Sequence, residues 1–313
     1  MSTAFYSHPE CRLHDMGAGH PECPQRLDAI TDHLRGTGLD IALQFHDAPL
    51  VTLQQLSRAH ASGYVAEVMD LMQRVCDAAE PRAVDPDTVV GVGTLQAALR
   101  SAGAAVAATD EVLAGRAANA FCAVRPPGHH ATRDQAMGFC FFNNVAVAAR
   151  HALDVHGLQR VAIIDFDVHH GNGTEDIIAG DERVLMCSIF QHPFYPYSGA
   201  EKPAANMCNV PLAAGCGGEE FRDAVTQVWM PRLKEFKPQM IFISAGFDAH
   251  VEDDMAGLAF VESDYAWVTQ LIKSFADQVC EGRIVSILEG GYNLSALGRS
   301  AEAHVRVLAE LNR

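Results

Sequence analysis

The segment from residue 161 to residue 174 constrains the fold and function of this chain more than any other. Its first four residues, Val-Ala-Ile-Ile, are apolar and predict a buried strand of an α/β sheet. The strand leads directly into the sequence DFDVHHGNG, in which two carboxylates and two imidazoles precede a glycine-rich turn. Because ligands of open α/β sheets bind at the carboxyl ends of the strands, polar groups at this point predict a site.

The polar residues of this segment have a spacing that suits metal ligands. Asp165, Asp167 and His169 alternate with period two, so their side chains point to one side while the chain stays extended. A carboxylate and an imidazole two residues apart are a suitable pair of ligands for a borderline metal ion such as zinc. Taken alone, the same segment is equally compatible with a polar turn at the end of a strand.

The composition argues against several classes of protein. A net charge of −16 disfavours a nucleic-acid-binding protein, which would present a basic face. The first residues lack the basic and apolar blocks of a signal peptide, and no apolar run is long enough to span a membrane. The nine cysteines include no CxxC pair, so reduced thiols in a cytoplasm are the simplest interpretation. We therefore expect a cytoplasmic protein with neither a nucleic-acid partner nor a membrane segment.

Apolar strands and helical patterns alternate along the rest of the chain. Besides the strand at 161–164, the sequence predicts strands at 120–124, 183–190, 240–248 and 283–288. Helical patterns begin near residue 27 and recur at 53–75, 89–113, 145–156, 174–179, 219–236, 262–280 and 294–311. This alternation predicts one mostly parallel α/β sheet. Since no linker or internal repeat is visible, we expect a single domain over residues 1–313.

Several of the predicted strands end in residues that are capable of chemistry. His129 and His130 follow one strand, Tyr292 follows another after two glycines, and a group of acidic residues that includes Asp253 follows a third. Parallel strands bring their carboxyl ends to the same edge, so these side chains are predicted to converge. Two ligands from the central segment and one late aspartate leave a zinc coordination position open for water and substrate. An adjacent imidazole as general base and a tyrosine hydroxyl as oxyanion donor suit hydrolysis of an amide or ester.

Five motifs in order resemble those of the histone deacetylase superfamily, most closely class II and the bacterial deacetylase-like amidohydrolases. The resemblance extends from His20 to about Arg299. It implies the arginase–deacetylase α/β fold, with an eight-stranded, mostly parallel sheet flanked by helices. The motifs are RPPGHHA at 125–131, GFCFFNN at 138–144, DFDVHHGNGT at 165–174, SAGFDAH at 244–250 and EGGYNL at 289–294.

The resemblance also implies a set of metal ligands. Asp167, His169 and Asp253 are expected to bind one catalytic zinc ion. Asp253 is chosen because the family ligand is taken to lie five residues after the aspartate of GFDA, which is Asp248 here. Asp254 stands where the family usually has proline, so the choice between Asp253 and Asp254 stays open at this point.

Catalytic roles follow from the same resemblance. His130 is expected to act as general base and then as general acid, while His129 assists electrostatically. Tyr292 is expected to polarise the acyl carbonyl together with zinc. Asp165 matches the carboxylate that orients His129, and Asn172 matches the partner of His130.

The remaining implied sites concern the substrate and a second ion. Phe139, next to Gly138, is expected to line an apolar tunnel for the acyl-lysine stem, and Met255 stands at a gatekeeper position. Arg26 matches an arginine near an internal channel through which acetate leaves. A structural potassium ion is expected at residues of the central segment and the following strand, namely Asp165, Asp167, His169 and Ser188.

The expected activity is zinc-dependent removal of acetyl or other acyl groups from a lysine ε-amine or a similar alkylamine. The expected substrates are acetylated lysine in a peptide or protein, or a small acylated amine, and a homo-oligomer is compatible with the sequence. An acetylpolyamine amidohydrolase is the alternative, although the apolar Met255 favours an acyl-lysine stem. A non-catalytic binding module and an arginase-like manganese hydrolase are less compatible with the residues. The catalytic positions are filled, and the Tyr292 motif and the single Asp-x-His ligand pair, Asp167 and His169, tell against a two-metal site.

Overall fold

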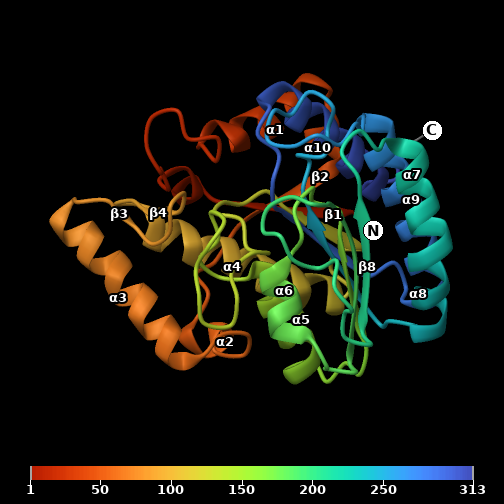
Figure 1. The fold of residues 1–313 in the computed structure, drawn as a ribbon, viewed down its shortest axis with the longest axis horizontal. Coiled ribbons are helices and arrows are strands. Elements are labelled where there is room, and N and C mark those ends of the chain that lie inside the picture. Colours follow the sequence, from red (N-terminus) through yellow and green to blue (C-terminus); the bar gives the residue numbers. More distant parts are fainter. Residues whose placement is uncertain (1, 312–313) are drawn as a thin grey trace.

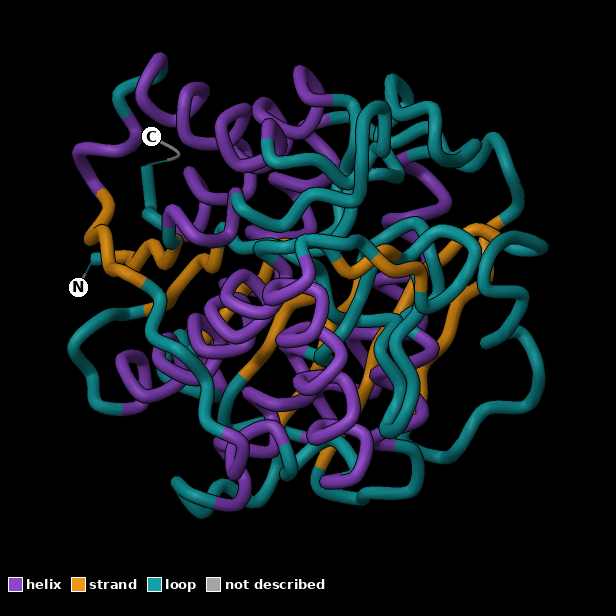
Figure 2. The backbone as a smooth tube through the Cα atoms, turned by 90° about the vertical axis from the view of Figure 1, so that its left-hand side faces the viewer, coloured by secondary structure: helices purple, strands orange, loops and turns teal. Residues whose placement is uncertain are grey.

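A parallel sheet of eight strands runs through the middle of the protein (Figures 1 and 2). The structure, a computed structural model, describes residues 2–311. The strand order is β2-β1-β5-β10-β9-β6-β7-β8, and every neighbouring pair is parallel. In that order the strands are Leu43–Asp47, Thr3–Ser7, Asn119–Cys122, Ile284–Leu288, Ile241–Ala245, Val161–Asp165, Val184–Gln191 and Met207–Leu212. The predicted α/β fold is confirmed, and the sheet is parallel throughout.

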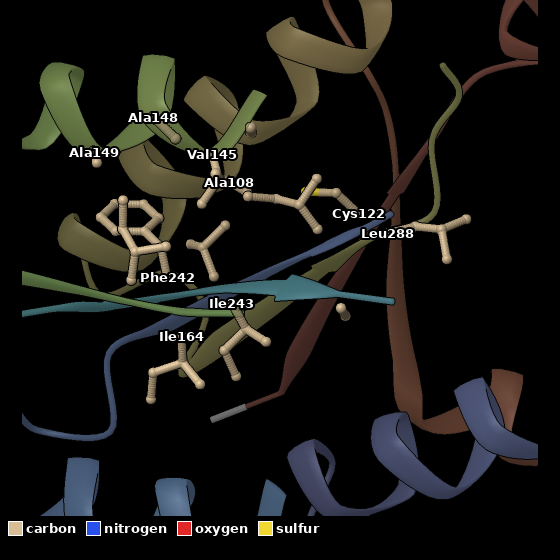
Figure 3. Close-up of a cluster of buried hydrophobic side chains, with 14 of the residues drawn as sticks. Ala108, Cys122, Val145, Ala148, Ala149, Ile164, Phe242, Ile243 and Leu288 are labelled. Atoms are coloured by element: carbon tan, nitrogen blue, oxygen red, sulfur yellow. The ribbon is translucent and has the colours of Figure 1, made fainter. Parts of the chain in front are cut away.

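Helices cover both faces of this sheet. In Figure 3, α4 and α5 lie on one face, and helices from the C-terminal part of the chain lie across the other. A separate antiparallel pair, β3 (Arg82–Ala83) and β4 (Val89–Val90), stands outside the main sheet. The helices are α1 Gln25–Gly36, α2 Leu53–Leu56, α3 Ser62–Ala78, α4 Thr94–Leu113, α5 Asn144–Asp154, α6 Asn172–Ile178, α7 Gly218–Ala224, α8 Met230–Phe236, α9 Glu262–Val279 and α10 Leu294–Leu308.

The central strands are apolar along their whole length because both of their faces are buried. Neighbouring residues point to opposite faces, as Figure 3 shows for Phe242 on the side of α5 and Ile243 on the other. Small residues such as Ala108 and Ala148 let α4 and α5 pack closely against that side. The buried apolar side chains form one continuous core cluster.

The structure differs from the predicted elements at several places. The short strands β1, β2 and β8 were not predicted, since β2 reads Leu-Gln-Phe-His-Asp and is largely exposed. The helix predicted at 53–75 is two helices, α2 and α3, and the one at 89–113 begins only at Thr94. A π-helical turn, Val225–Trp229, separates α7 from α8 within the helix predicted at 219–236. None of the helices in residues 2–311 combines the length and the apolar character needed to cross a bilayer.

The strand order decides where the polar strand ends meet. Strands β5, β10, β9 and β6 are consecutive neighbours in the sheet. Their carboxyl ends lead to the segments that begin at Ala123, Glu289, Gly246 and Phe166. These four segments carry most of the predicted site residues, and the sheet brings them to one edge.

Candidate metal centre and active-site pocket

Three ligand atoms of Asp167, His169 and Asp248 lie within 4.8 Å of one another, and all three residues are buried. His169 Nδ1 is 3.0 Å from Asp167 Oδ1 and 3.2 Å from Asp248 Oδ2. Ligands held tetrahedrally at zinc-binding distances would be separated by about 3.3 Å, so the spacing suits a single ion. Asp167 and His169 belong to the segment after β6, and Asp248 follows β9, the strand that pairs with β6.

Backbone groups hold these carboxylates in place. Asp248 Oδ1 accepts a hydrogen bond from the Val168 N–H at 2.9 Å, and Asp167 Oδ2 accepts one from the Gly290 N–H at 2.8 Å. Asp248 Oδ2 is buried and makes no hydrogen bond with the residues described, although it lies at ion-pair distance from His169. A buried carboxylate oxygen without a hydrogen-bond donor is suited to bind a metal ion.

The predicted ligand Asp253 is buried and holds the loop that carries Tyr292. Its Oδ2 accepts the backbone N–H groups of Tyr292 at 2.6 Å and Asn293 at 3.0 Å, and its Oδ1 accepts that of Met255 at 3.0 Å. Asp253 is not one of the three residues of the metal-ligating group. The geometric group therefore contains Asp248 and not Asp253, whose role as a ligand stays a prediction, and the exposed Asp254 is not in the group either.

The histidine pair lies beside this group, and each ring has its own partner. His130 Nδ1 is 2.7 Å from Asn172 Oδ1, and His129 Nδ1 is 3.0 Å from Asp165 Oδ2. Because an amide oxygen only accepts, Nδ1 of His130 carries the proton and Nε2 presents its lone pair. Burial and the neighbouring His129 hold the pKa of His130 well below its usual range. Burial opposes the charge of His129, but Asp167 and Asp165 outweigh it and raise the pKa of His129.

Glu289 is a buried part of the site that the sequence analysis missed. Its Oε2 accepts the backbone N–H groups of Gly128 at 2.7 Å and His129 at 3.1 Å, and its Oε1 accepts the Ser244 hydroxyl at 2.9 Å. Burial raises the pKa of Glu289 to about 7. Glu289 directly follows strand β10. The rule that polar residues at strand ends form a site, which identified Asp165, therefore also predicts Glu289.

A cavity of about 160 Å³ opens onto these groups. His130 and His169 form part of its wall, so the cavity reaches both the candidate base and a candidate ligand. Six of its nine lining residues were predicted as site residues, and three were not, because a cavity wall formed by separate loops leaves no local sequence signal. Besides His130 and His169, the predicted ones are Gly138, Phe139, Met255 and Tyr292; the missed ones are Asp87, Phe194 and Tyr195.

Two glycines leave the room that this site requires. A Cβ on Gly290 would lie 2.0 Å from Asp248 Oδ2 and 2.6 Å from Asp167 Oδ2. Gly138 has a φ of +55°, and a Cβ there would lie 2.5 Å from Cδ2 of His130. Both positions therefore require glycine if the site residues are to keep these positions.

Arg26 lies behind the tyrosine of the pocket and is fully buried. It donates from Nε to the Gly291 carbonyl at 2.6 Å and from Nη2 to the Glu289 carbonyl at 2.5 Å. Its guanidinium carbon lies 4.9 Å from the centroid of the Tyr292 ring, within cation–π distance. These contacts place Arg26 against the loop that carries Tyr292.

The residues predicted for potassium lie at the junction of two strands. Asp165 of β6 and Ser188 of β7 are direct partners in the parallel register. The Asp165 side chain also accepts the Asp167 N–H at 3.1 Å, and that of Asp167 accepts the His169 N–H at 2.8 Å. Asp165, Asp167, His169 and Ser188 are therefore neighbours at this point of the sheet.

Comparison with known proteins gives consistent matches over nearly the whole chain. Residues 20–308 match the family model described as the histone deacetylase domain. A histone deacetylase-like amidohydrolase from Pseudomonas aeruginosa is 38% identical over 283 residues, covering 88% of this chain and 73% of that protein. A probable deacetylase from Archaeoglobus fulgidus is 35% identical over 307 residues, covering 94% and 82%. The crystal structure of the HDA15 HD domain superimposes with a TM-score of 0.91 at 34% identity, covering 99% of this chain and 88% of that one.

Proposed function

The chain belongs to the histone deacetylase family, and from that premise we propose that it is a zinc-dependent amidohydrolase. Its proposed reaction removes acetyl or other acyl groups from the ε-amine of acyl-lysine or from a similar alkylamine. One observation carries the proposal. The ligand atoms of Asp167, His169 and Asp248 converge beside the His130–Asn172 pair, where a cavity reaches them.

Asp167, His169 and Asp248 would hold the zinc ion. Two carboxylates and one imidazole are ligand types that suit zinc. The buried Oδ2 of Asp248 makes no hydrogen bond with the residues described, so it is available to bind the ion. Such an ion supplies Lewis-acid chemistry, since it polarises an amide carbonyl and makes water more acidic. A structural potassium ion at Asp165, Asp167, His169 and Ser188 is proposed from the family resemblance.

His130 is the proposed proton carrier. Its Nδ1–H is directed at Asn172 Oδ1, so Nε2 is free to take a proton from the attacking water. The same nitrogen then returns the proton to the departing amine. The His129 ring lies 4.1 Å from the His130 ring between centroids, and Asp165 is hydrogen-bonded to His129. The charges of His129 and Asp165 therefore act on His130.

Tyr292 is the proposed oxyanion donor. Its backbone is held by Asp253, and its ring is packed between Phe139, at 5.9 Å between ring centroids, and the Arg26 guanidinium. A preorganised hydroxyl of this kind stabilises negative charge on the former carbonyl oxygen without reorganising.

The cavity lining indicates the type of amine. Phe139, Phe194 and Met255 offer an apolar wall for an alkyl stem. Among the described residues that line the cavity, Asp87 is the one with a carboxylate. An acyl-lysine stem fits such a lining. The alternative, an acetylpolyamine, is favoured only by the nearby acidic residues Glu252 and Asp254, which are not in the cavity lining.

The test of the proposed function combines metal removal with a variant. The protein stripped with a chelator should lose hydrolysis of an acetyl-lysine peptide and regain it when zinc is added. Tyr292→Phe should lower kcat by about a hundred- to a thousand-fold, the usual loss for one oxyanion donor. It should still bind the metal, as measured by mass spectrometry of the dialysed protein.

Two results would contradict the proposal: activity that survives complete metal removal, or an unchanged kcat in Tyr292→Phe. The substrate class has its own measurement, a comparison of kcat/KM for acetyl-lysine peptides, acetylspermidine and acetylputrescine. A higher value for the polyamines would replace acyl-lysine by the alternative while leaving the chemistry in place.

A further inference from the structure

A second group of metal-ligating side chains lies outside the active-site pocket. Asp110, His151 and His156 each offer one ligand atom, and these atoms lie within 4.8 Å of one another. Asp110 Oδ1 is 2.7 Å from His151 Nε2 and 2.6 Å from His156 Nε2. The imidazole rings stand nearly perpendicular, with centroids 5.2 Å apart, so both Nε2 atoms are directed at one point.

The topology puts this group at the opposite edge of the sheet from the pocket. Asp110 is in the last turn of α4, His151 is in the last turn of α5, and His156 follows two residues after that helix ends. The next strands, β5 and β6, begin at this edge and end at the pocket. Helices α4 and α5 pack side by side (Figure 3), and the contact between Asp110 and His151 joins their carboxyl ends.

The surroundings favour a cation. Backbone carbonyls at the ends of two helices carry partial negative charge, which stabilises positive charge nearby. The side chains of Asp110 and His156 are 44% and 30% exposed, so water has access to the remaining coordination positions. His151 is buried and anchors the group.

We propose that Asp110, His151 and His156 form a second metal-binding site, which takes zinc or a similar divalent transition metal ion. Two imidazole nitrogens and one carboxylate oxygen are the ligand types that this class of ion prefers. Ligands around zinc are separated by about 3.3 Å, so the two hydrogen bonds have to open by roughly 0.7 Å. His156 lies past the end of α5 and is exposed, so its ring is free to make this movement.

Arg58 is a positively charged residue beside the group and opposes the ion. Its Nη1 lies 3.4 Å from His151 Nδ1, which acts as acceptor and places the ring proton on Nε2. When a metal ion replaces that proton, Nδ1 becomes the protonated nitrogen and the half-buried Arg58 side chain has to turn away. The metal site and the Arg58 contact are therefore mutually exclusive, and this gives the proposal a specific signature.

The test counts metal ions on the intact protein. The wild-type chain and its variants are dialysed against micromolar zinc, and bound zinc per chain is measured by mass spectrometry. His156→Gln and Asp110→Asn should each bind one ion fewer than the wild type, with unchanged deacetylase activity. Asp110→Asn keeps a hydrogen-bond acceptor, so it separates metal binding from a simple hydrogen-bonded cluster.

Arg58→Gln should bind the second ion about threefold more tightly, since it removes the Arg58 contact with His151 Nδ1 that the ion has to break. His33→Gln, which changes a histidine in the last turn of α1, is the control and should bind as much zinc as the wild type. The proposal is overturned if His156→Gln and the wild type bind equal zinc, or if Arg58→Gln weakens binding. The expected difference of one bound zinc ion per chain between the wild type and His156→Gln does not depend on the catalytic proposal.

Discussion

Glu22 is a buried carboxylate shared by two buried arginines. It accepts hydrogen bonds from Arg125 at 2.5 Å and 2.6 Å and from Arg26 at 3.1 Å, and all three side chains are fully buried. Arg26 in turn holds the carbonyls of Glu289 and Gly291, on either side of the loop that leads to Tyr292. Replacing Glu22 by glutamine would leave two buried guanidinium groups without a countercharge.

The expected loss of stability follows from two independent estimates. Burial opposes the charge of Glu22, but Arg125, His14 and Arg26 together lower the pKa of Glu22 from 4.5 to about 2. Burial also lowers the pKa of His14 to about 4, so His14 is neutral at pH 7 and the arginines stabilise the carboxylate. At about 1.4 kcal/mol per pKa unit, the pairing is worth about 3–4 kcal/mol. Breaking a buried ion pair by removing one partner costs about 3–5 kcal/mol, which agrees.

The pH dependence has a definite sign. The folded-state pKa lies below the unfolded one, so this stabilisation is fully present above about pH 4.5 and is lost as the pH falls towards 2. Glu22→Gln should therefore be destabilised relative to the wild type by the same amount from pH 8 to pH 5. The difference should shrink below pH 4.5.

Urea unfolding followed by circular dichroism, at several pH values, measures this difference. Asp32→Asn is the control, because Asp32 faces Arg35 across 3.8 Å on the surface and should have no measurable effect. A Glu22→Gln variant within 1 kcal/mol of the wild type at pH 7 would refute the reasoning. So would a difference that grows below pH 4.5.

Three further predictions concern the pocket. Asp248→Asn should weaken zinc binding by more than the 10- to 100-fold typical of an outer partner, whereas Asp253→Asn should keep its zinc. Equilibrium dialysis measures both, and the reverse order would identify Asp253 as the ligand, as the sequence predicts. Tyr195→Phe removes a hydroxyl that lines the cavity and makes no hydrogen bond with the residues described. KM for an acetyl-lysine peptide should therefore fall about fivefold. An unchanged KM would count against an apolar substrate stem beside Tyr195. Gly138→Ala should lower kcat by about a hundredfold, because its Cβ would displace His130, and wild-type kcat would show that the ring has room to move.

The sequence predicts the central strands well because their two buried faces make them continuously apolar. The strands β5, β6, β7, β9 and β10 were all predicted to within a few residues at their bounds. The edge strand β2 escaped prediction because only its first residue, Leu43, is buried, so no apolar run or clean alternation marks it. The break between α2 and α3 at residues 57–61 was missed because apolar residues keep a helical spacing across it.

The site was predictable where side chains directly follow a buried strand. Asp165, Asp167 and His169 lie there, and the same argument applied to strand β9 leads to Asp248. The choice of Asp253 came instead from a spacing taken over from the family. A sequence spacing does not show where a carboxylate lies relative to the other ligands, so Asp253 as a ligand stays a prediction beside Asp248.

The pocket residues Phe194 and Tyr195 were beyond sequence reasoning for a different reason. They lie on a loop after β7, and their position over the site is set by contacts with distant residues. Phe194 stacks on the ring of His169 at 5.5 Å between centroids, and Tyr195 meets His130 edge-on at 5.2 Å. Loop geometry of this kind has no periodic signature.

The position of β9 between β10 and β6 has a consequence for how the protein is made. Val168 and Asp248, which are joined by a hydrogen bond, are 80 residues apart in the chain. During synthesis, Asp167 and His169 therefore emerge long before the third candidate ligand. Two ligands alone bind a metal ion weakly. The centre becomes complete only when β9 docks against β6, so metal uptake should be a late event that reports an assembled sheet.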